Sequence, residues 1–467
     1  MGTATVAPGA IELAFSGRFG FGIYRWAYLP FDVPAGVQRI RVSTSHDNFA
    51  VGGVTRNVLD IGIFGPAGYD LGNAAGFRGW SGGARDGFVI SHAYATPGYL
   101  AGPIDPGIWA VALGPVVLSP WGMAWQVHVT MERGECVLGP PASDPVVISP
   151  PPAVSGARWY RGDLHLHTVH SDGERHPNEL ASAGQASGLD FIVSTDHNTN
   201  AANRAWAACD TGGLLVIPGE EVTTRHGHWL AVGLSPGAWV DWRYGPRDGV
   251  FSRFAAEVRE VGGLVVAAHP CVPLPGSAWE FGFADVDALE VWNGRWNVDD
   301  ELSLRVWQRL LRQGRRVAAV GGSDSHGKHQ PVGSPQTVIH AAELSTPAIV
   351  DGLRCGRSYL ARSCDVALDF TASCPRGEGV AGPGQTLRVT RDDRVTVTAV
   401  ISGAAGTNVA LITAAGCAGR ATVESDRARL RWELDAATAR FARLEVREAQ
   451  RRPLGVIVAL TNPVWLG

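Results

Sequence analysis

The sequence lacks the features that mark membrane, secreted and nucleic-acid-binding proteins. No stretch approaches the roughly 18 consecutive apolar residues of a membrane-spanning helix, and the first residues, Met-Gly-Thr-Ala-Thr-Val-Ala-Pro, have no basic start followed by an apolar core. Basic charge is not in excess either, because 40 Lys and Arg stand against 44 Asp and Glu, for a formal net charge of −4. We therefore expect neither a membrane nor nucleic acid as a default partner.

Cysteine and lysine are also scarce. No Cys-x-x-Cys pair occurs, which argues against a disulfide framework or a thiolate zinc site and favours a reducing, cytoplasmic setting. Lys328 is the single lysine. With 467 residues, 45% of them hydrophobic and 18% charged, the chain predicts two or three folded domains. The seven cysteines are scattered: Cys136, Cys209, Cys271, Cys355, Cys364, Cys374 and Cys417.

The two ends of the chain alternate apolar and polar residues with a period of two. Short runs such as 38–44 and 125–131 are separated by turns rich in Gly, Pro and Asn, and they predict an N-terminal β-sandwich over 1–145. A proline-dense segment, 146–157, is predicted to be a linker. Alternation returns in 394–400 and 427–434 and predicts a C-terminal β-sandwich over 364–467.

Between these ends, residues 158–363 follow a different pattern, because short apolar strands alternate with helical stretches. Such repetition predicts a parallel sheet, with a closed or nearly closed α/β barrel as its natural form. The predicted strands are 191–194, 214–217, 264–268, 288–292 and 317–320, and the predicted helices are 177–186, 251–261 and 301–313. The first helix has Pro177 at its start and Gly188 after its end.

The most informative motif is Asp163-Leu-His165-Leu-His167-Thr-Val-His170-Ser-Asp172-Gly. On a strand, His165 and His167 point to the same side, so both imidazoles can reach one metal ion. A loop then returns Asp172 towards them. A His-x-His pair on its own also occurs by chance on protein surfaces.

The pair is not isolated, because later strands also end in residues that bind hard metal ions. The carboxyl ends of barrel strands converge on one face, where active sites are assembled. One such residue is commonly a simple hydrogen-bonding group or a helix cap, but nearly ten buried ionisable groups would be costly without cations. These later residues are Asp196 and His197, Glu220 and Glu221, His226 and His228, His269, Asp324 and His326.

These stretches together resemble the polymerase and histidinol phosphatase (PHP) superfamily of metallohydrolases, and most closely its carbaryl-hydrolase-like CehA/McbA branch. The matching segments are 163–173, 194–198, 218–222, 268–270 and 322–327. The resemblance implies a distorted (β/α)7 PHP barrel between the two sandwiches. The usual activity of this superfamily implies a hydrolase with a di- or trinuclear metal centre.

The resemblance also implies which residues bind each ion. His165, His167, Glu221 and Asp324 would hold a first ion, and Glu221 would bridge it to a second bound by His228 and His269. Asp172, His197 and His326 would hold a third, with His170 as a spare candidate. Glu221 is preferred over Glu220 because Gly219 fixes the register of the family pattern.

Ligands of this kind suit Zn, Mn or Fe, and two or three such divalent ions would lower the pKa of a bridging water so that hydroxide acts as nucleophile. Asp196, beside His197, would orient an imidazole or handle a proton. We favour a small, anionic phosphoester as the substrate. The residues expected to contact it are Arg225, Arg295, Lys328 and His329.

Two other functions remain open from the sequence. The carbaryl-hydrolase resemblance suggests a carbamate, ester or amide substrate, for which Trp229, Trp292 and Trp296 could line an apolar pocket, although tryptophans more often serve packing. A carbohydrate- or surface-binding protein with a structural metal core is the non-enzymatic alternative. The flanking sandwiches could cover the barrel or shape its mouth, and the sequence leaves the oligomeric state open.

Overall fold

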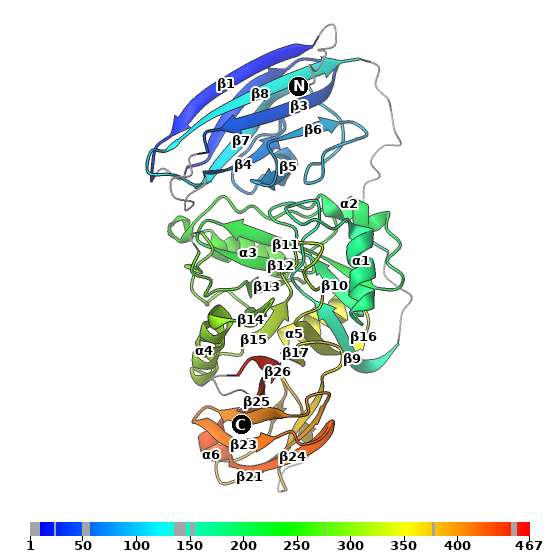
Figure 1. Cartoon of the computed structure of the whole chain (residues 1–467), viewed down its shortest axis with the longest axis vertical. Coiled ribbons are helices and arrows are strands. Elements are labelled where there is room, and N and C mark those ends of the chain that lie inside the picture. Colours follow the sequence, from blue (N-terminus) through cyan, green and yellow to red (C-terminus); the bar gives the residue numbers. More distant parts are fainter. Residues whose placement is uncertain are drawn as a thin grey trace.

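Three β-rich regions follow one another along the long axis of the molecule (Figure 1). The structure is a computed structural model that describes residues 10–22, 25–48, 57–134, 146–149, 155–274, 276–375, 379–449 and 455–467. Residues 150–154 of the predicted linker, 146–157, lie outside these ranges, as does Cys136. Within them, no helix is long and apolar enough to cross a bilayer, and the cysteines are free.

The N-terminal region consists of two antiparallel four-stranded sheets, ordered β1-β8-β3-β6 and β2-β7-β4-β5. Side chains on their facing surfaces, including Ile40, Ile61 and Val129, are fully buried, as alternation of period two predicts. The elements are β1 (Ile11–Phe19), β2 (Ala27–Val33), β3 (Val37–His46), β4 (Val58–Phe64), η1 (Ala74–Gly76), β5 (Phe77–Gly82), β6 (Gly87–Ser91), β7 (Gly107–Val117) and β8 (Met123–Arg133).

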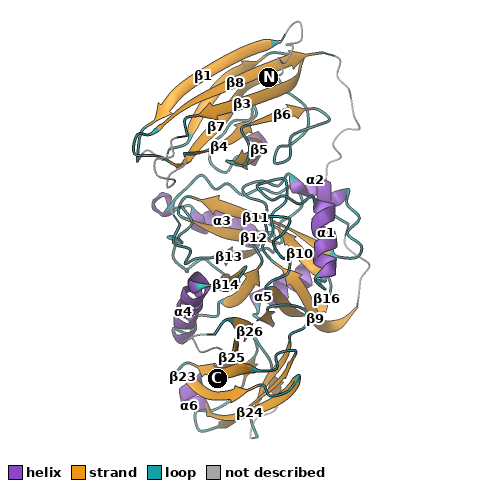
Figure 2. Ribbon diagram, in the orientation of Figure 1, coloured by secondary structure: helices purple, strands orange, loops and turns teal. Residues whose placement is uncertain are grey.

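The central region is a mixed sheet with few helices (Figure 2). Its strands are β9 (Ser155–Asp163), β10 (Phe191–Ser194), β11 (Leu215–Thr224), β12 (Gly227–Val232), β13 (Leu264–Ala267), β14 (Ala288–Asn293), β15 (Ala318–Gly322), β16 (Gln336–Glu343) and β17 (Ser358–Ala361). Its helices are α1 (Pro177–Ala186), α2 (Ala202–Ala207), η2 (Pro246–Asp248), α3 (Phe251–Glu260), α4 (Val298–Arg312) and α5 (Thr346–Arg354).

The prediction of a parallel sheet is wrong in the middle of this region. Strands β9, β10 and β11 are parallel, as are β13, β14 and β15, but β12 is antiparallel to both β11 and β13. The link between β11 and β12 spans Arg225 and His226, and so short a turn reverses the chain and leaves no room for a helix. The region is therefore mixed α/β, without a helix after every strand.

Local sequence signals account for the elements that were predicted well. Helix α1 has Pro177 at its first position, the Glu179 carboxylate accepts a hydrogen bond from the His176 backbone N–H at 2.8 Å, and Gly188 follows with a φ of 72°. These are the start and stop signals that the sequence carries. Both α1 and β10 have the predicted bounds.

The C-terminal region continues the central sheet, because β26 pairs with β17 and the sheet then runs through β25, β22 and β23. A second sheet, β19-β18-β21-β24, packs against it. The elements are β18 (Ala367–Ser373), β19 (Val380–Ala381), β20 (Thr386–Leu387), β21 (Arg394–Ser402), β22 (Thr407–Thr413), β23 (Gly416–Thr422), β24 (Arg427–Asp435), α6 (Ala436–Ala439), β25 (Phe441–Glu448), β26 (Ile457–Thr461) and β27 (Val464–Leu466).

The N-terminal sandwich packs on the other end of the central region through aromatic and charged side chains. The rings of Trp80 and Trp242 lie 4.5 Å apart between centroids. Arg243 forms a buried ion pair with Asp241 at 2.6 Å and donates a hydrogen bond to the Tyr28 hydroxyl at 2.6 Å. This contact places the sandwich over the face where β9, β10 and β11 end.

Candidate metal centre

Two segments from opposite ends of the central region meet where β9 and β15 end. His165 and His167 lie just beyond β9 rather than within it, and Leu166 forms a bridge with Ser325. The Asp324 N–H donates to the His165 carbonyl at 2.9 Å, and the His167 N–H donates to the Ser325 carbonyl at 3.2 Å. The extended backbone still directs both imidazoles to one side, as the predicted alternation requires.

Glu221 is the centre of the site. Its carboxylate oxygens lie within 3.4 Å of a nitrogen from each of five imidazoles, which come from four different segments. The side chain itself is 1% exposed. The five distances from Glu221 are 2.8 Å to His197 Nδ1, 2.9 Å to His228 Nδ1, 3.1 Å to His165 Nε2, 3.1 Å to His269 Nε2 and 3.4 Å to His167 Nε2.

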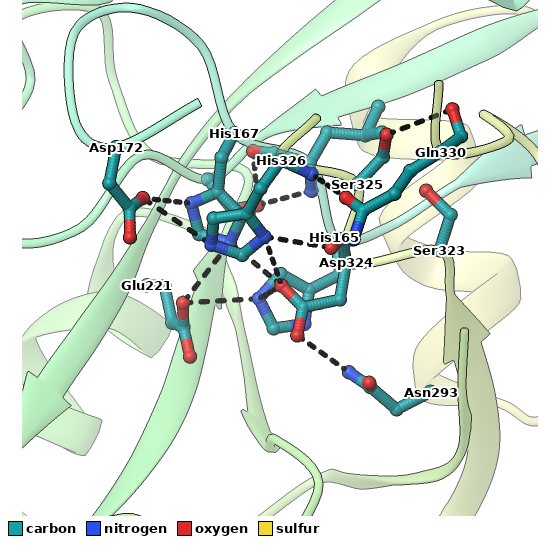
Figure 3. Close-up of polar contacts among 12 residues, drawn as sticks. His165, His167, Asp172, Glu221, Asn293, Ser323, Asp324, Ser325, His326 and Gln330 are labelled. Carbon is teal, nitrogen blue, oxygen red and sulfur yellow. Dashed lines mark hydrogen bonds and ion pairs between the residues drawn. The ribbon is translucent and has the colours of Figure 1, made fainter. Parts of the chain in front are cut away.

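Two further carboxylates extend the cluster towards solvent (Figure 3). Asp324 Oδ1 lies 2.9 Å from His167 Nε2 and 3.3 Å from His165 Nε2. Asp172 Oδ1 lies 3.3 Å from His326 Nε2, and its side chain is 43% exposed. The carboxylates of the cluster therefore differ in exposure, from the buried Glu221 to Asp172 at the edge of the site.

The donor atoms form overlapping groups in which all ligand atoms lie within 4.8 Å of one another. Three groups contain the sets that the family resemblance implied, and His167 joins the third of them. A fourth group includes Glu290, which the sequence analysis missed. The groups are His165, His167, Glu221 and Asp324; Glu221, His228 and His269; His167, Asp172, His197 and His326; and His165, His269 and Glu290.

The donor set fits divalent ions. His165 Nε2 and Glu221 Oε2 are buried and make no hydrogen bond, although they lie only 3.1 Å apart. Buried polar atoms of this kind are costly unless they have a partner. Two that point at a common position, among imidazole and carboxylate donors, are arranged as ligands of a shared ion.

The charges of the cluster shift the pKa values of its members strongly. Burial alone lowers the pKa of His165, but the carboxylates of Asp324, Glu221 and Glu290 raise it well above its ordinary value. Burial and the neighbouring imidazoles of His197 and His326 lower the pKa of His167 to about 4. The site thus separates its imidazoles into groups that favour and disfavour a proton.

Backbone strain is concentrated in the same place. His269 and Asp324 adopt positive φ angles of 27° and 48°, and Asn198, beside His197, has a φ of 54°. Such conformations cost about 1–3 kcal/mol each for residues other than glycine and persist where the surroundings impose them. Here they turn two ligand side chains inward at strand ends.

Buried acids behind the ligands hold them in position. Glu290 Oε1 lies 3.1 Å from His165 Nδ1, and Glu290 Oε2 accepts a hydrogen bond from the His269 N–H at 2.8 Å. Its signal in the sequence is a single carboxylate inside an otherwise apolar strand. Asp163 accepts hydrogen bonds from the N–H groups of Ser323 and Gly333, and so joins the ends of β9 and β15; burial raises its pKa to about 6.

Asp196 and Glu220 belong to none of these donor groups. Asp196 accepts hydrogen bonds from the Thr168 N–H at 2.8 Å and the Ser171 hydroxyl at 2.6 Å, so it shapes the loop that carries Asp172. Glu220 accepts from the Val240 N–H at 3.0 Å, and burial raises its pKa well above the ordinary value. Of the two adjacent glutamates, the structure places Glu221 in the cluster.

Of the four residues predicted to contact substrate, one lines a cavity and three do not. Arg225 lines a cavity of about 670 Å³ that also reaches Asp172, His197 and His228. Arg295, Lys328 and His329 are exposed and do not line it, and Lys328 Nζ forms an ion pair with Glu179 at 3.0 Å. The predicted pocket walls Trp229, Trp292 and Trp296 are likewise absent from its lining.

The cavity has an unexpected wall. Trp26, Val58, Asp60, Trp80 and Val116 line it, and all five belong to the N-terminal sandwich. No local motif in the sequence marks these residues, because the sandwich could be placed over the site only from the three-dimensional structure. The N-terminal sandwich therefore lies at the mouth of the candidate metal centre.

Neither the protein-family models nor the curated proteins include a match to this chain. Among solved structures, a two-domain protein from Bacteroides vulgatus containing a predicted PHP-like metal-dependent phosphoesterase is 18% identical, with a TM-score of 0.39, over 67% of this chain and 98% of the other. A proposed metal-dependent phosphoesterase from Bifidobacterium adolescentis is 22% identical, with a TM-score of 0.28, over 37% and 90%.

An amidohydrolase from Chromobacterium violaceum, solved with bound sulfate and no metal, is 20% identical, with a TM-score of 0.27, over 37% of this chain and 89% of the other. All three TM-scores lie below 0.5. We therefore infer the function of this chain from the geometry of its own side chains.

Proposed function

We propose that this chain is a metal-dependent hydrolase of the PHP type that acts on phosphate esters. The supporting observation is the Glu221 carboxylate, which lies within 3.4 Å of five imidazoles while two buried donor atoms lack hydrogen bonds. A structural metal site needs about four ligands around one ion. Overlapping donor groups that open onto a cavity are suited to catalysis.

The proposal extends to the family branch and the barrel. The motifs from Asp163 to His326 follow the PHP order and resemble the CehA/McbA branch. Strands β9 to β15 supply the seven strands that a distorted PHP barrel requires. The antiparallel β12 is one source of that distortion.

Each part of the site has a proposed role. Divalent ions, when bound, supply Lewis-acid activation of water and of the scissile group. Glu221 and Asp324 hold neighbouring donor groups in a fixed relation. Glu290 and Asp163 keep the imidazoles and strand ends in place from behind. Among the described residues that line the cavity, Arg225 is the one arginine, and it would contact the substrate.

A phosphoester fits the number of donor groups better than a carbonyl substrate. A phosphoryl group offers several anionic oxygens to neighbouring ions, whereas a carbonyl offers one oxygen. The groups centred on Glu221, Asp324 and Asp172 lie side by side through the shared residues Glu221 and His167. This arrangement supports two or three ions that act on one substrate.

Hydrolysis of a carbamate or carboxylic ester is the second candidate. The observation that favours it is the cavity wall, where Trp26, Trp80, Val58 and Val116 provide apolar surface beside one arginine. A phosphate monoester of a small, polar alcohol would gain little from that wall. A phosphodiester or a neutral carbamate with an apolar group would gain more.

Hydrolysis of chromogenic substrates by matched variants tests the proposal. We would load the full chain with Mn²⁺ or Zn²⁺ and assay p-nitrophenyl phosphate, bis(p-nitrophenyl) phosphate and a p-nitrophenyl carbamate. Glu221→Gln is expected to lower kcat/KM by more than about a thousandfold, since it removes a shared ligand, whereas Glu220→Gln, its buried neighbour, should retain activity. Turnover of the carbamate alone would favour the second candidate. Equal activity of both variants would refute the assignment.

A further inference from the structure

The cavity beside the candidate metal centre lies between the N-terminal sandwich and the central region, and residues of both line it. At about 670 Å³ it has the size of a small-molecule site. It reaches Asp172, His197 and His228 on one side and the N-terminal sandwich on the other. A substrate whose reacting group is at the metal centre must therefore extend towards the sandwich.

Trp26 is positioned by the sheet beneath it. Gly114 on β7 leaves space for the indole, since a Cβ atom at that position would lie 1.9 Å from the ring. The Trp26 ring packs edge-on against Trp80 at 5.3 Å and Trp242 at 6.0 Å. Because Trp26 is only half-buried, part of its surface is left to line the cavity.

Arg225 and Asp60 complete the wall with opposite charges. The guanidinium carbon of Arg225 lies 4.1 Å from the Trp26 ring centroid, in a cation–π contact. Asp60 accepts a hydrogen bond from the Gly83 N–H and interacts electrostatically with Arg225. When Asp60 is ionised it offsets the charge of Arg225, so this part of the cavity is not built to select a strongly anionic group.

The N-terminal sandwich also holds the loop that joins the cavity to the metal centre. Arg85 donates hydrogen bonds to the carbonyls of Val169 at 2.6 Å and Ser171 at 3.2 Å, directly before Asp172. The Thr199 hydroxyl donates to the Gly98 carbonyl at 2.9 Å, two residues after His197. The wall and the third donor group are therefore fixed to each other.

We infer that the N-terminal sandwich supplies a subsite for the non-reacting part of the substrate, and that this part is a flat, uncharged ring that lies against Trp26. This inference rests on the proposed hydrolase function and specifies its substrate class: esters that carry an aromatic group. The ring would cover the exposed part of the indole beside Arg225, and burial of its apolar surface would strengthen binding.

Binding of paired, non-hydrolysable ligands tests the subsite without requiring turnover. Isothermal titration of the metal-loaded full chain with phenylphosphonate and methylphosphonate should show at least about tenfold tighter binding of the phenyl compound. Trp26→Ala should abolish that preference, and Trp26→Phe should keep most of it. Ile108→Ala, an exposed apolar residue at the other end of β7 from Val116, should leave it unchanged.

Equal affinities in the wild type, or a phenyl preference that survives Trp26→Ala, would overturn the subsite. Phenylboronate and methylboronate separate its failure from that of the phosphoesterase proposal, because they mimic the tetrahedral state of carbonyl hydrolysis. If neither phosphonate binds but phenylboronate keeps a Trp26-dependent preference, the subsite stands and phosphoester hydrolysis is refuted. If neither phenyl compound binds better than its methyl counterpart, the subsite is refuted.

Discussion

The two β-sandwiches, similar in sequence pattern, are attached to the central region in different ways. The C-terminal one continues the central sheet through backbone pairing of β17 with β26, and Asn462 bonds both the N–H and the carbonyl of Ala319. The N-terminal one docks through side chains such as Trp80 and Arg243. The cavity beside the candidate metal centre lies at the side-chain contact, where the N-terminal sandwich lines it. A cavity of about 410 Å³ also lies at the C-terminal contact, but it is lined by α4 and strands of the C-terminal sandwich and does not reach the candidate ligands.

We therefore expect mutations at the two contacts to have different effects. Changes at the N-terminal contact should alter both stability and activity, because that contact shapes the cavity. Changes at the C-terminal contact should alter stability with little effect on activity.

The largest difference is expected from two buried arginines. Arg243→Ala leaves Asp241 as a buried, unpaired charge and should lower the free energy of unfolding by about 3–5 kcal/mol. It should also lower kcat/KM about tenfold or more, since misplacement of substrate-facing groups is costly. Arg443→Ala removes a pair with Glu445, which Arg447 still contacts, so we expect less destabilisation. Its kcat/KM should change less than twofold.

Chemical unfolding and steady-state assays, both at a temperature where each variant is folded, measure the two quantities. A loss of activity in Arg443→Ala as large as that in Arg243→Ala would remove the functional distinction between the two contacts.

A smaller, local effect is expected from Arg85→Ala. This change removes two hydrogen bonds to the loop before Asp172, and loss of such outer contacts typically weakens metal binding about 10- to 100-fold. Titration of metal-free protein should show weakening of one ion while the remaining ions bind as before. Arg312→Ala, which removes a hydrogen bond to Ala414 in the C-terminal sandwich, serves as the control and should leave every ion unaffected.

The two contacts should also respond to pH in opposite directions in metal-free protein. Enclosure in the cavity raises the pKa of Asp60 from 3.8 to about 7. The folded state then binds the proton more tightly, so its contribution to stability is complete below about pH 4 and is lost as the pH rises towards 7. Asp60→Asn should flatten this decline in the free energy of unfolding between about pH 4 and 7.

Glu445 should show the reverse dependence. Burial raises its pKa, but Arg443 and Arg447 outweigh burial and lower the pKa below its ordinary 4.5. Its contribution is therefore present above about pH 4.5 and is lost as the pH falls. Glu445→Gln should flatten the acidic limb of the stability profile, measured by urea unfolding. If Asp60→Asn instead changed the loss of stability below about pH 4.5, the assignment of the two groups would be wrong.

The smallest effect is expected from Lys328→Ala. Its Nζ forms an exposed ion pair with Glu179, and exposed pairs contribute little to stability. Since Lys328 lies outside the cavity, kcat/KM should change less than twofold. A tenfold loss would show that substrate extends past His326 rather than towards the N-terminal sandwich.

The sequence predicts which imidazoles and carboxylates gather in the cluster because these residues follow buried strands. Strands that end on one face bring His269 and Asp324 close whatever the detailed topology, so the predicted proximity of these side chains survives the error about the antiparallel β12. Closeness to a candidate ligand along the chain does not predict where a side chain points. Lys328 is two residues from His326, yet its side chain points to Glu179.

Residues that act across a domain boundary were not predictable in the same way. Trp26 and Asp60 lie in strands or turns of a sandwich whose alternation predicts only which side chains face its core. Their place beside Arg225 depends on how two folded surfaces dock. Glu290 was missed for a different reason, because a lone carboxylate in a buried strand indicates a special environment but not which imidazole it contacts.

The most direct test of the central claim is anomalous X-ray scattering from crystals of the full chain grown with Mn²⁺ or Zn²⁺. We expect two or three anomalous peaks among the donor groups that share Glu221 and His167, with the first peak between His165, Glu221 and Asp324. Peaks at unrelated surface residues, or none at the Glu221 cluster in metal-saturated crystals, would contradict it.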